Sequence, residues 1–131
     1  MSNYIEKAKK IRAIEIPHHN CAQSVLMSFT EKLGIDDETA YKIGACFGAG
    51  MKCGSICGVI TGGLMVLGLL GIDDPEITRK FIEDFKARHD GMLDCSDLLR
   101  ANAKNGGERK PHCDALVYEI VREIESIADL K

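Results

Sequence analysis

Residues 55–72, SICGVITGGLMVLGLLGI, are the one segment of this chain that could be mistaken for a membrane span. The segment carries no charged side chain and is long enough to cross a bilayer. Five glycines dilute its hydrophobicity, however, and no aromatic residues flank it at either end. We therefore predict a central apolar helix that other helices surround, in preference to a membrane-spanning one.

The rest of the chain has the pattern of amphipathic helices. Asn20 is a good N-cap for an apolar-periodic run that Gly34 would end, Asp74 followed by Pro75 begins another helix, and Pro111 would open the last one. We expect helices at residues 2–15, 20–33, 37–46, 55–70, 75–88, 94–101 and 112–129. The prediction is an all-α single domain over residues 1–131, a helical bundle of about 5–7 helices around the central Gly-rich apolar helix.

Three glycines of the apolar segment and its approach recur every four residues, at Gly54, Gly58 and Gly62. This spacing gives a helix a smooth face on which another helix can pack closely. The second helix is expected to come from the same chain or from a second copy in a homodimer.

Charge and the N-terminal sequence restrict the partners and the compartment. The net charge of −3 leaves no basic surplus, so nucleic acid is not an expected partner. A short basic run in residues 7–12 is best explained as the solvated face of an amphipathic helix. The N-terminal sequence MSNYIEKAKK lacks the apolar segment of a secretory signal, which predicts a cytoplasmic, reducing environment for the six cysteines.

Four of the six cysteines fall at the predicted starts of four different helices: Cys21, Cys57, Cys95 and Cys113. Free N–H groups and the positive end of the helix dipole stabilise a thiolate there, and a thiolate is the form that nucleophiles and metal ligands require. We predict that these four cysteines form one functional site. Cys46 is instead expected to be a small, buried packing residue.

Cys53 and Cys57 form the pair CGSIC, which is neither a CxxC redox motif nor a zinc knuckle. The spacing predicts one helical turn that brings both sulfurs to one face, with Cys53 as a resolving thiol for Cys57.

Histidines lie beside two of the cysteines in sequence. His18 and His19 precede Cys21, and His112 directly precedes Cys113. Each could supply a nitrogen ligand or a proton acceptor, although a solvated loop histidine is the simpler explanation. His89 is expected to be exposed.

Residues 44–54, GACFGAGMKCG, form a glycine-rich stretch whose backbone could approach a ligand closely. Gly50, Gly54 and Gly58 are therefore candidate cofactor-binding positions. The stretch is not a Walker A loop, because Lys52 is followed by a cysteine and no strand precedes it.

The segments HNCAQSVLMSF, FGAGMKCGSICGVITGGLMVLGL, DGMLDCSDLL and CDALV together resemble the redox-active protein family named for its C_GCAxxG_C_C cysteine signature. Cys21, Cys57, Cys95 and Cys113 occupy the positions of the four signature cysteines. Val59 stands where the family's CGAxxG motif has alanine. The resemblance implies a redox role, without an established reaction.

Three functional hypotheses follow. The first is electron transfer with an unidentified redox partner, in which the four cysteines act as thiol/disulfide pairs or as ligands of an iron–sulfur cluster; catalysis would make the protein a thiol-dependent oxidoreductase. The second is a structural zinc site built from the same four thiolates, with or without His112. The third is a helical interaction module that dimerises through its glycine face and has only packing cysteines. No hydrolase signature is present.

Overall fold

The computed structural model describes residues 3–130, which form eight α-helices, one short π-like turn and no strand. The elements are α1 (Asn3–Ala13), α2 (Cys21–Met27), α3 (Thr30–Leu33), α4 (Asp37–Gly44), η1 (Gly50–Gly54), α5 (Gly58–Leu69), α6 (Pro75–Arg88), α7 (Cys95–Lys104) and α8 (Arg109–Ile127). The predicted all-α fold is confirmed.

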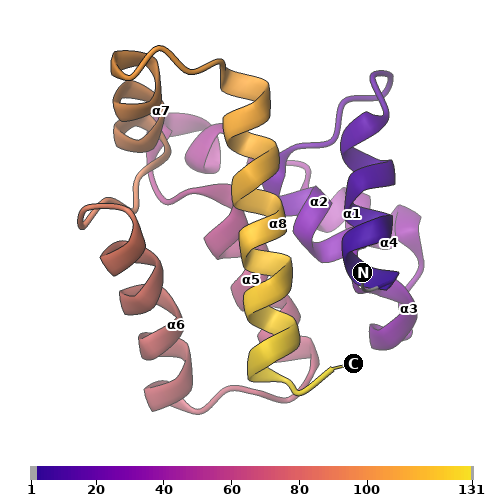
Figure 1. Cartoon of the computed structure of the whole chain (residues 1–131). Coiled ribbons are helices and arrows are strands. Elements are labelled where there is room, and N and C mark those ends of the chain that lie inside the picture. Colours follow the sequence, from indigo (N-terminus) through magenta and orange to yellow (C-terminus); the bar gives the residue numbers. More distant parts are fainter. Residues whose placement is uncertain (1–2, 131) are drawn as a thin grey trace.

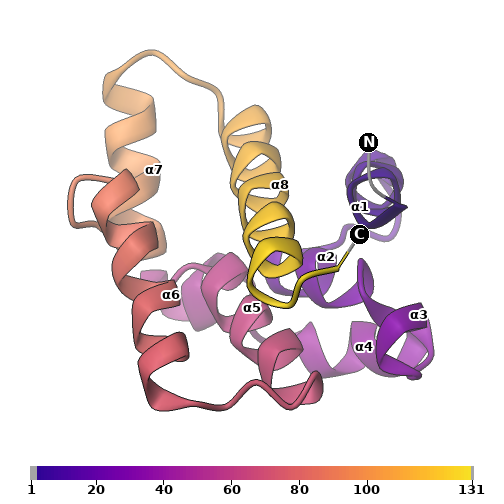
Figure 2. The same cartoon turned by 60° about the horizontal axis from the view of Figure 1, so that its bottom comes forward.

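The helices lie in two layers around one cluster of buried apolar side chains (Figures 1 and 2). Helices α2 to α5 form one layer, α1, α8 and α7 lie on the other side, and α6 runs beside α5. Helix α5 contacts α2, α6 and α8, and its Val59, Ile60, Val66 and Leu67 are fully buried. The core therefore forms between the apolar helix α5 and the helices that pack on it, α2, α6 and α8.

Helix α5 packs closely on α2 through two of its glycines. An ideal Cβ on Gly58 would lie 2.9 Å from the Ala22 nitrogen, and one on Gly62 would lie 2.8 Å from the Ala22 carbonyl oxygen. The close helix contact that the glycine spacing predicts is thus made within the chain. The extension of this face to Gly54 is wrong, since Gly54 ends η1 with φ +72° and lies next to Ser96.

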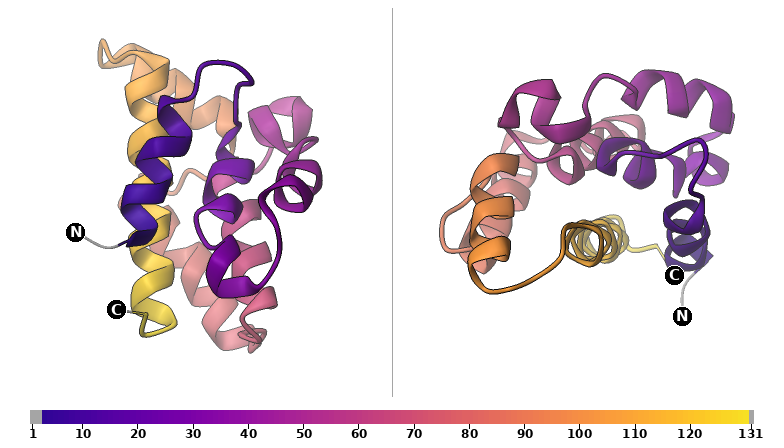
Figure 3. Two further views of the ribbon diagram at one scale, coloured as in Figure 1. Left: turned by 90° about the vertical axis from the view of Figure 1, so that its right-hand side faces the viewer. Right: turned by 90° about the horizontal axis from the view of Figure 1, so that it is seen from above.

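Helices α1 and α8 lie side by side and run in opposite directions (Figure 3). The end of α1 therefore meets the start of α8. Arg12 Nε donates to Asp114 at 2.6 Å, and Lys110 Nζ donates to the Arg12 carbonyl oxygen at 2.9 Å. Arg12 Nη1 also donates to the His19 carbonyl oxygen at 2.8 Å, so the buried guanidinium links α1, α8 and the segment before α2.

Most predicted helix ends are confirmed, because they depend on local chemistry. Asn20 forms a capping box with Gln23, and Asp74 caps α6 with Pro75 as its first residue. Gly34 ends α3 in the left-handed conformation.

The prediction of one helix over residues 20–33 is wrong. The helix is interrupted between α2 and α3, where Phe29 has non-helical dihedral angles. Ser28 Oγ donates to the Ser24 carbonyl oxygen at 2.7 Å, and Thr30 Oγ1 donates to the Met27 carbonyl oxygen at 3.1 Å. Such side-chain bonds to backbone carbonyls bend helices. This break and the separate turn η1 raise the number of elements above the seven predicted ranges.

Two helix starts also differ from the prediction. Helix α5 begins at Gly58 rather than near residue 55, so Cys57 is its N-cap and not part of its first turn. Helix α8 begins at Arg109, and Pro111 is its third residue. A proline in the first turn removes an N–H that has no intrahelical acceptor in any case.

No helix formed by residues 3–130 combines the length and the apolar character that crossing a membrane would require.

Candidate functional site

The capping box at Asn20 positions the first cysteine. Asn20 Oδ1 accepts from the Gln23 amide at 2.8 Å, and the Asn20 side chain donates to the Gly44 carbonyl oxygen at 3.0 Å. Cys21 is the first residue of α2, directly after this cap. Its thiol is held at a helix start, as the sequence predicts.

Two short extended segments bring Cys57 and Cys95 together, although they lie 38 positions apart in sequence. The Cys57 amide donates to the Leu93 carbonyl oxygen at 3.0 Å, and the Cys95 amide donates to the Ser55 carbonyl oxygen at 2.7 Å. These bonds flank an antiparallel bridge between Ile56 and Asp94. This pairing holds Cys57 and Cys95, the residues that follow Ile56 and Asp94, next to the same cavity.

The four cysteines predicted to form a site line one small cavity of about 30 Å³, which has room for a water molecule or two. They are Cys21, Cys57, Cys95 and Cys113. All are free thiols in this structure. The cavity therefore joins the starts of α2, α5 and α7 to the second turn of α8.

Cys46 and Cys53 lie elsewhere. Cys46 is exposed, so its prediction as a buried packing residue is wrong. Cys53 is also exposed and lies in η1, where its φ of −135° is not helical. The prediction that Cys53 and Cys57 share one helical turn is wrong, because residues 55–57 are extended between η1 and α5.

Gly50 and Gly58 line the cysteine cavity, whereas Gly54 does not. A Cβ on Gly50 would overlap the Ser55 carbonyl oxygen and lie 2.8 Å from Cys95 Cβ; one on Gly58 would lie 3.2 Å from Cys21 Cβ. The two glycines thus let the backbone pass close to two of the thiols.

The loop beside the cavity is strained. Ala49, Met51 and Lys52 have φ of 52°, 58° and 65°, in the left-handed region that non-glycine residues rarely adopt. Gly50, between them, has φ +63°. Such strain persists only where surrounding contacts enforce it, and it is concentrated at functional sites.

Cys113 is the acidic thiol of the cluster. A hydrogen bond from the Cys21 thiol lowers the pKa of Cys113 from 9.0 to about 6, against the effect of burial, and the positive charges of Arg12 and Arg109 lower it further. The same hydrogen bond, together with burial, raises the pKa of Cys21 well above 9.0. At neutral pH, Cys113 is therefore a thiolate and Cys21 a thiol that donates to it.

The other two thiols are protonated. Burial raises the pKa of Cys57 to about 12, and Cys57 is only 3% exposed. Burial and the negative charge of Cys113 raise the pKa of Cys95. The prediction that helix starts stabilise four thiolates is thus wrong for three of them, because burial and the neighbouring Cys113 raise their pKa values in spite of the helix N-termini.

Two histidines near the cluster have a buried nitrogen without a hydrogen-bond partner among residues 3–130: His19 at Nδ1 and His112 at Nε2. His112 lines the cysteine cavity, and burial lowers its pKa. His18 is exposed. His89 is not exposed as predicted, since its Nε2 lies 2.9 Å from Glu119 Oε1 on α8 and its ring packs on Phe85.

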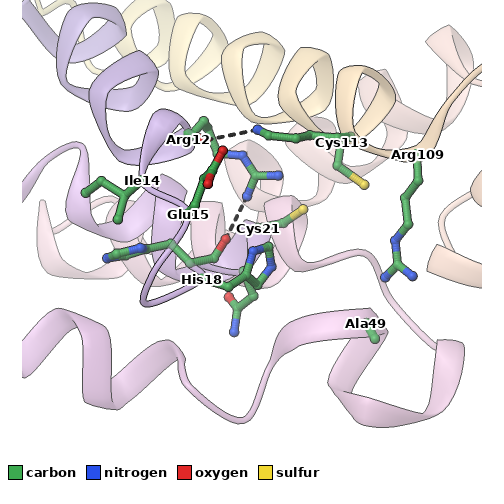
Figure 4. Close-up of a pocket in the computed structure, with 11 residues that line it drawn as sticks. Arg12, Ile14, Glu15, His18, Cys21, Ala49, Arg109 and Cys113 are labelled. Atoms are coloured by element: carbon green, nitrogen blue, oxygen red, sulfur yellow. Dashed lines mark hydrogen bonds between the residues drawn. The ribbon is translucent and has the colours of Figure 1, made fainter.

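A larger pocket of about 410 Å³ opens beside the Cys21–Cys113 pair (Figure 4). The sulfurs of both cysteines point into the space between Arg12 and Arg109. Its cationic wall, formed by Arg12, Arg109 and Lys110, was missed by the sequence analysis. The spacing of Arg109 and Cys113, four residues apart and hence on one helix face, is the signal that could have identified it.

Within residues 3–130, no group of three or more His, Cys, Asp or Glu side chains is arranged to hold a metal ion. The predicted ligand set of Cys21, Cys57, Cys95 and Cys113 shares a cavity but not, as placed, the geometry of a metal site. Metal binding by these four cysteines stays a prediction.

The fold and the site define an all-α protein with a cluster of free thiols, one of which has a lowered pKa. The chain belongs to the family described as "Putative redox-active protein (C_GCAxxG_C_C)", whose sequence profile matches residues 19–127. This confirms the resemblance carried by the cysteine segments. No curated protein and no solved structure is significantly similar to the chain.

Proposed function

We propose that the protein exchanges electrons by thiol–disulfide chemistry, with Cys113 as the attacking thiolate and Cys21 as the resolving thiol. The observation that carries this proposal is that Cys21 and Cys113 line the same pocket with both sulfurs pointing into it (Figure 4), where one thiol is acidic and its neighbour is not. A thiolate that is largely formed at neutral pH is the nucleophile in disulfide exchange, and a second thiol in the same cavity is placed to complete it.

The reaction proceeds in two balanced steps. The Cys113 thiolate attacks one sulfur of a substrate disulfide, the substrate S–S bond breaks, and a mixed disulfide forms while the first thiolate leaves. Cys21 then gives its proton to the substrate thiolate released in the first step and attacks Cys113 Sγ. The second substrate thiolate leaves, and a Cys21–Cys113 disulfide remains. Two electrons pass from the protein to the substrate, and the reverse sequence oxidises a substrate dithiol.

Charge and burial assign different parts to the remaining cysteines. Cys57 is enclosed and protonated, so it is a poor nucleophile at neutral pH. Cys53 is exposed and outside the cavity, which makes Cys21 the better placed resolving thiol for Cys113. The same chemistry serves an electron carrier or a thiol-dependent oxidoreductase.

The test is to oxidise the reduced protein with excess disulfide and to map its cross-links by peptide mass spectrometry. We expect an intramolecular Cys21–Cys113 disulfide. Cys21→Ser should accumulate the mixed disulfide on Cys113, and Cys113→Ser should form neither product. A Cys46→Ser/Cys53→Ser double variant is the matched control and should behave as the wild type. A protein whose Cys21 and Cys113 stay reduced while the exposed thiols react would refute the proposal.

The iron–sulfur and zinc hypotheses make different predictions for the same protein. Anaerobic purification followed by visible absorption and metal analysis tests both. Stoichiometric iron with charge-transfer bands that is lost in Cys57→Ser would favour the iron–sulfur hypothesis over thiol exchange. Stoichiometric zinc without colour that is lost in the same variant would favour the zinc hypothesis. Metal-free protein with the reversible Cys21–Cys113 disulfide supports thiol exchange.

A further inference from the structure

The pocket beside the thiol pair has the size of a small-molecule site. Its volume of about 410 Å³ lies within the range of about 300–1,000 Å³ that is typical of such pockets. The sulfur atoms of Cys21 and Cys113 reach it, so a molecule bound there lies next to the attacking thiolate. A reacting group held in place beside a nucleophile reacts faster than one that arrives by diffusion.

Three cations and one carboxylate, that of Glu15, line this pocket, so its wall carries a net positive charge, but the three cations are not equivalent. Arg12 is committed to Asp114, to the His19 carbonyl oxygen and to Ser24 Oγ. Lys110 also bonds Asp114, at 3.1 Å. These two side chains therefore fix the wall and are partly neutralised by one carboxylate.

Arg109 is the cation with capacity to spare. It is exposed, and although it hydrogen-bonds Cys113, it forms no ion pair with a carboxylate in the part of the chain that the structure describes, residues 3–130. Its guanidinium extends from the start of α8 towards Ala49, which also lines the pocket (Figure 4). A planar guanidinium with free N–H groups binds carboxylates and phosphates well.

A buried histidine also lines the pocket. His19 lines the pocket and is only 7% exposed, yet its Nδ1 has no hydrogen-bond partner among the described residues. Buried polar groups are almost always satisfied, so an unpartnered one at a pocket wall needs an explanation. Nδ1 itself is enclosed by protein atoms, so a molecule in the pocket reaches it only if the wall moves.

We propose that this pocket binds a small anionic disulfide, whose carboxylate pairs with Arg109 and whose S–S bond is thereby presented to Cys113. This inference rests on the proposed function and adds its substrate class: low-molecular-weight disulfides with acid groups. The chemistry is the exchange described above, in which the bound disulfide is the oxidant and leaves as two thiols. Ile14, which also lines the pocket, offers an apolar contact for the carbon chain.

The test compares the reaction of Cys113 with three disulfides of similar size. They are the dianionic 3,3′-dithiodipropionate, the neutral bis(2-hydroxyethyl) disulfide and the dicationic cystamine. The rate of Cys113 with each disulfide is divided by the rate at which a cysteine-containing reference peptide reacts with the same disulfide, which removes the differences in leaving-group reactivity. We expect Cys113 to prefer the anionic disulfide by about tenfold over the neutral one, as a charge-assisted hydrogen bond would give, and added salt to weaken the preference.

Variants locate the preference. Arg109→Gln should lower the ratio of anionic to neutral rates by about tenfold, while the ratio itself cancels any change in Cys113 nucleophilicity. Lys104→Gln, which removes an exposed charge from the end of α7, is the matched control and should keep the ratio. Equal normalised rates for all three disulfides, with the Cys21–Cys113 disulfide still forming, would overturn this inference and leave the proposed function intact. A loss of preference in Lys104→Gln as large as in Arg109→Gln would also overturn it.

Discussion

The hydrogen bond between Cys21 and Cys113 makes a quantitative prediction for the Cys21→Ala variant. A hydrogen bond to a charged group contributes about 1.5–3 kcal/mol, and one pKa unit corresponds to 1.36 kcal/mol. Removing the donor should therefore raise the pKa of Cys113 by about 1–2 units, from about 6 towards 7–8. It should remain below 9.0, because Arg12 and Arg109 still favour the thiolate.

Cys21→Ser is the matched control for this change. A serine hydroxyl keeps a donor at the same position and has no thiol of its own to ionise. The pKa of Cys113 should then stay much closer to 6 than in Cys21→Ala. The rate of alkylation by iodoacetamide, followed at the Cys113 peptide by mass spectrometry as a function of pH, gives the pKa in each protein.

Two results would contradict this reasoning. An unchanged pKa of Cys113 in Cys21→Ala would mean that the arginines alone hold the thiolate. An equal rise in Cys21→Ala and Cys21→Ser would mean that packing around the pair matters more than the donated hydrogen bond.

Three further predictions concern stability and reactivity. Gly62→Ala should destabilise the fold by about 1–3 kcal/mol, because its Cβ would press on the Ala22 backbone. Gly68 has open space around it, so Gly68→Ala should stabilise the fold by about 0.5–1 kcal/mol. Urea denaturation measures both changes. Cys57 should resist alkylation at pH 8 until the protein is unfolded, and labelling in the native state would contradict its burial. The folded pKa of Cys113, about 6, lies below its unfolded value of 9.0, so the thiolate stabilises the fold at high pH. The free energy of unfolding should therefore increase as the pH is raised from about 6 to 8.5, and this contribution should be lost as the pH falls through about 6. The pH profile of Cys113→Ser should be flatter over this range.

Sequence reasoning succeeds here where the cause is local. The Asn20 cap and the Asp74–Pro75 start depend on a few adjacent residues, and Gly58 and Gly62 predict close packing from their spacing alone. It fails where the cause is tertiary. The bridge between Ile56 and Asp94 needs two segments that only the folded chain brings together, and it moves the start of α5 past Cys57.

The site shows the same division. The family resemblance selects the four cysteines, and the structure brings them to one cavity. Their chemical difference is not encoded near any one of them. Cys21 and Cys95 both open a helix, yet the structure raises the pKa of both, because burial and a neighbouring thiolate act across the fold. Cys113, in the second turn of its helix, is the acidic one.

Electrostatic coupling explains why one thiol of the four ionises. Each thiolate in a shared, partly dehydrated cavity raises the pKa of its neighbours, so a second negative charge is disfavoured once the first has formed. Cys113 takes that charge because it has both the donor Cys21 and the cations Arg12 and Arg109 beside it. Burial of Cys57 outweighs the hydrogen bond from the Val59 amide, raises its pKa to about 12 and keeps it protonated. The cluster therefore holds one nucleophile, and its reactivity faces the pocket lined by Arg109 rather than the core.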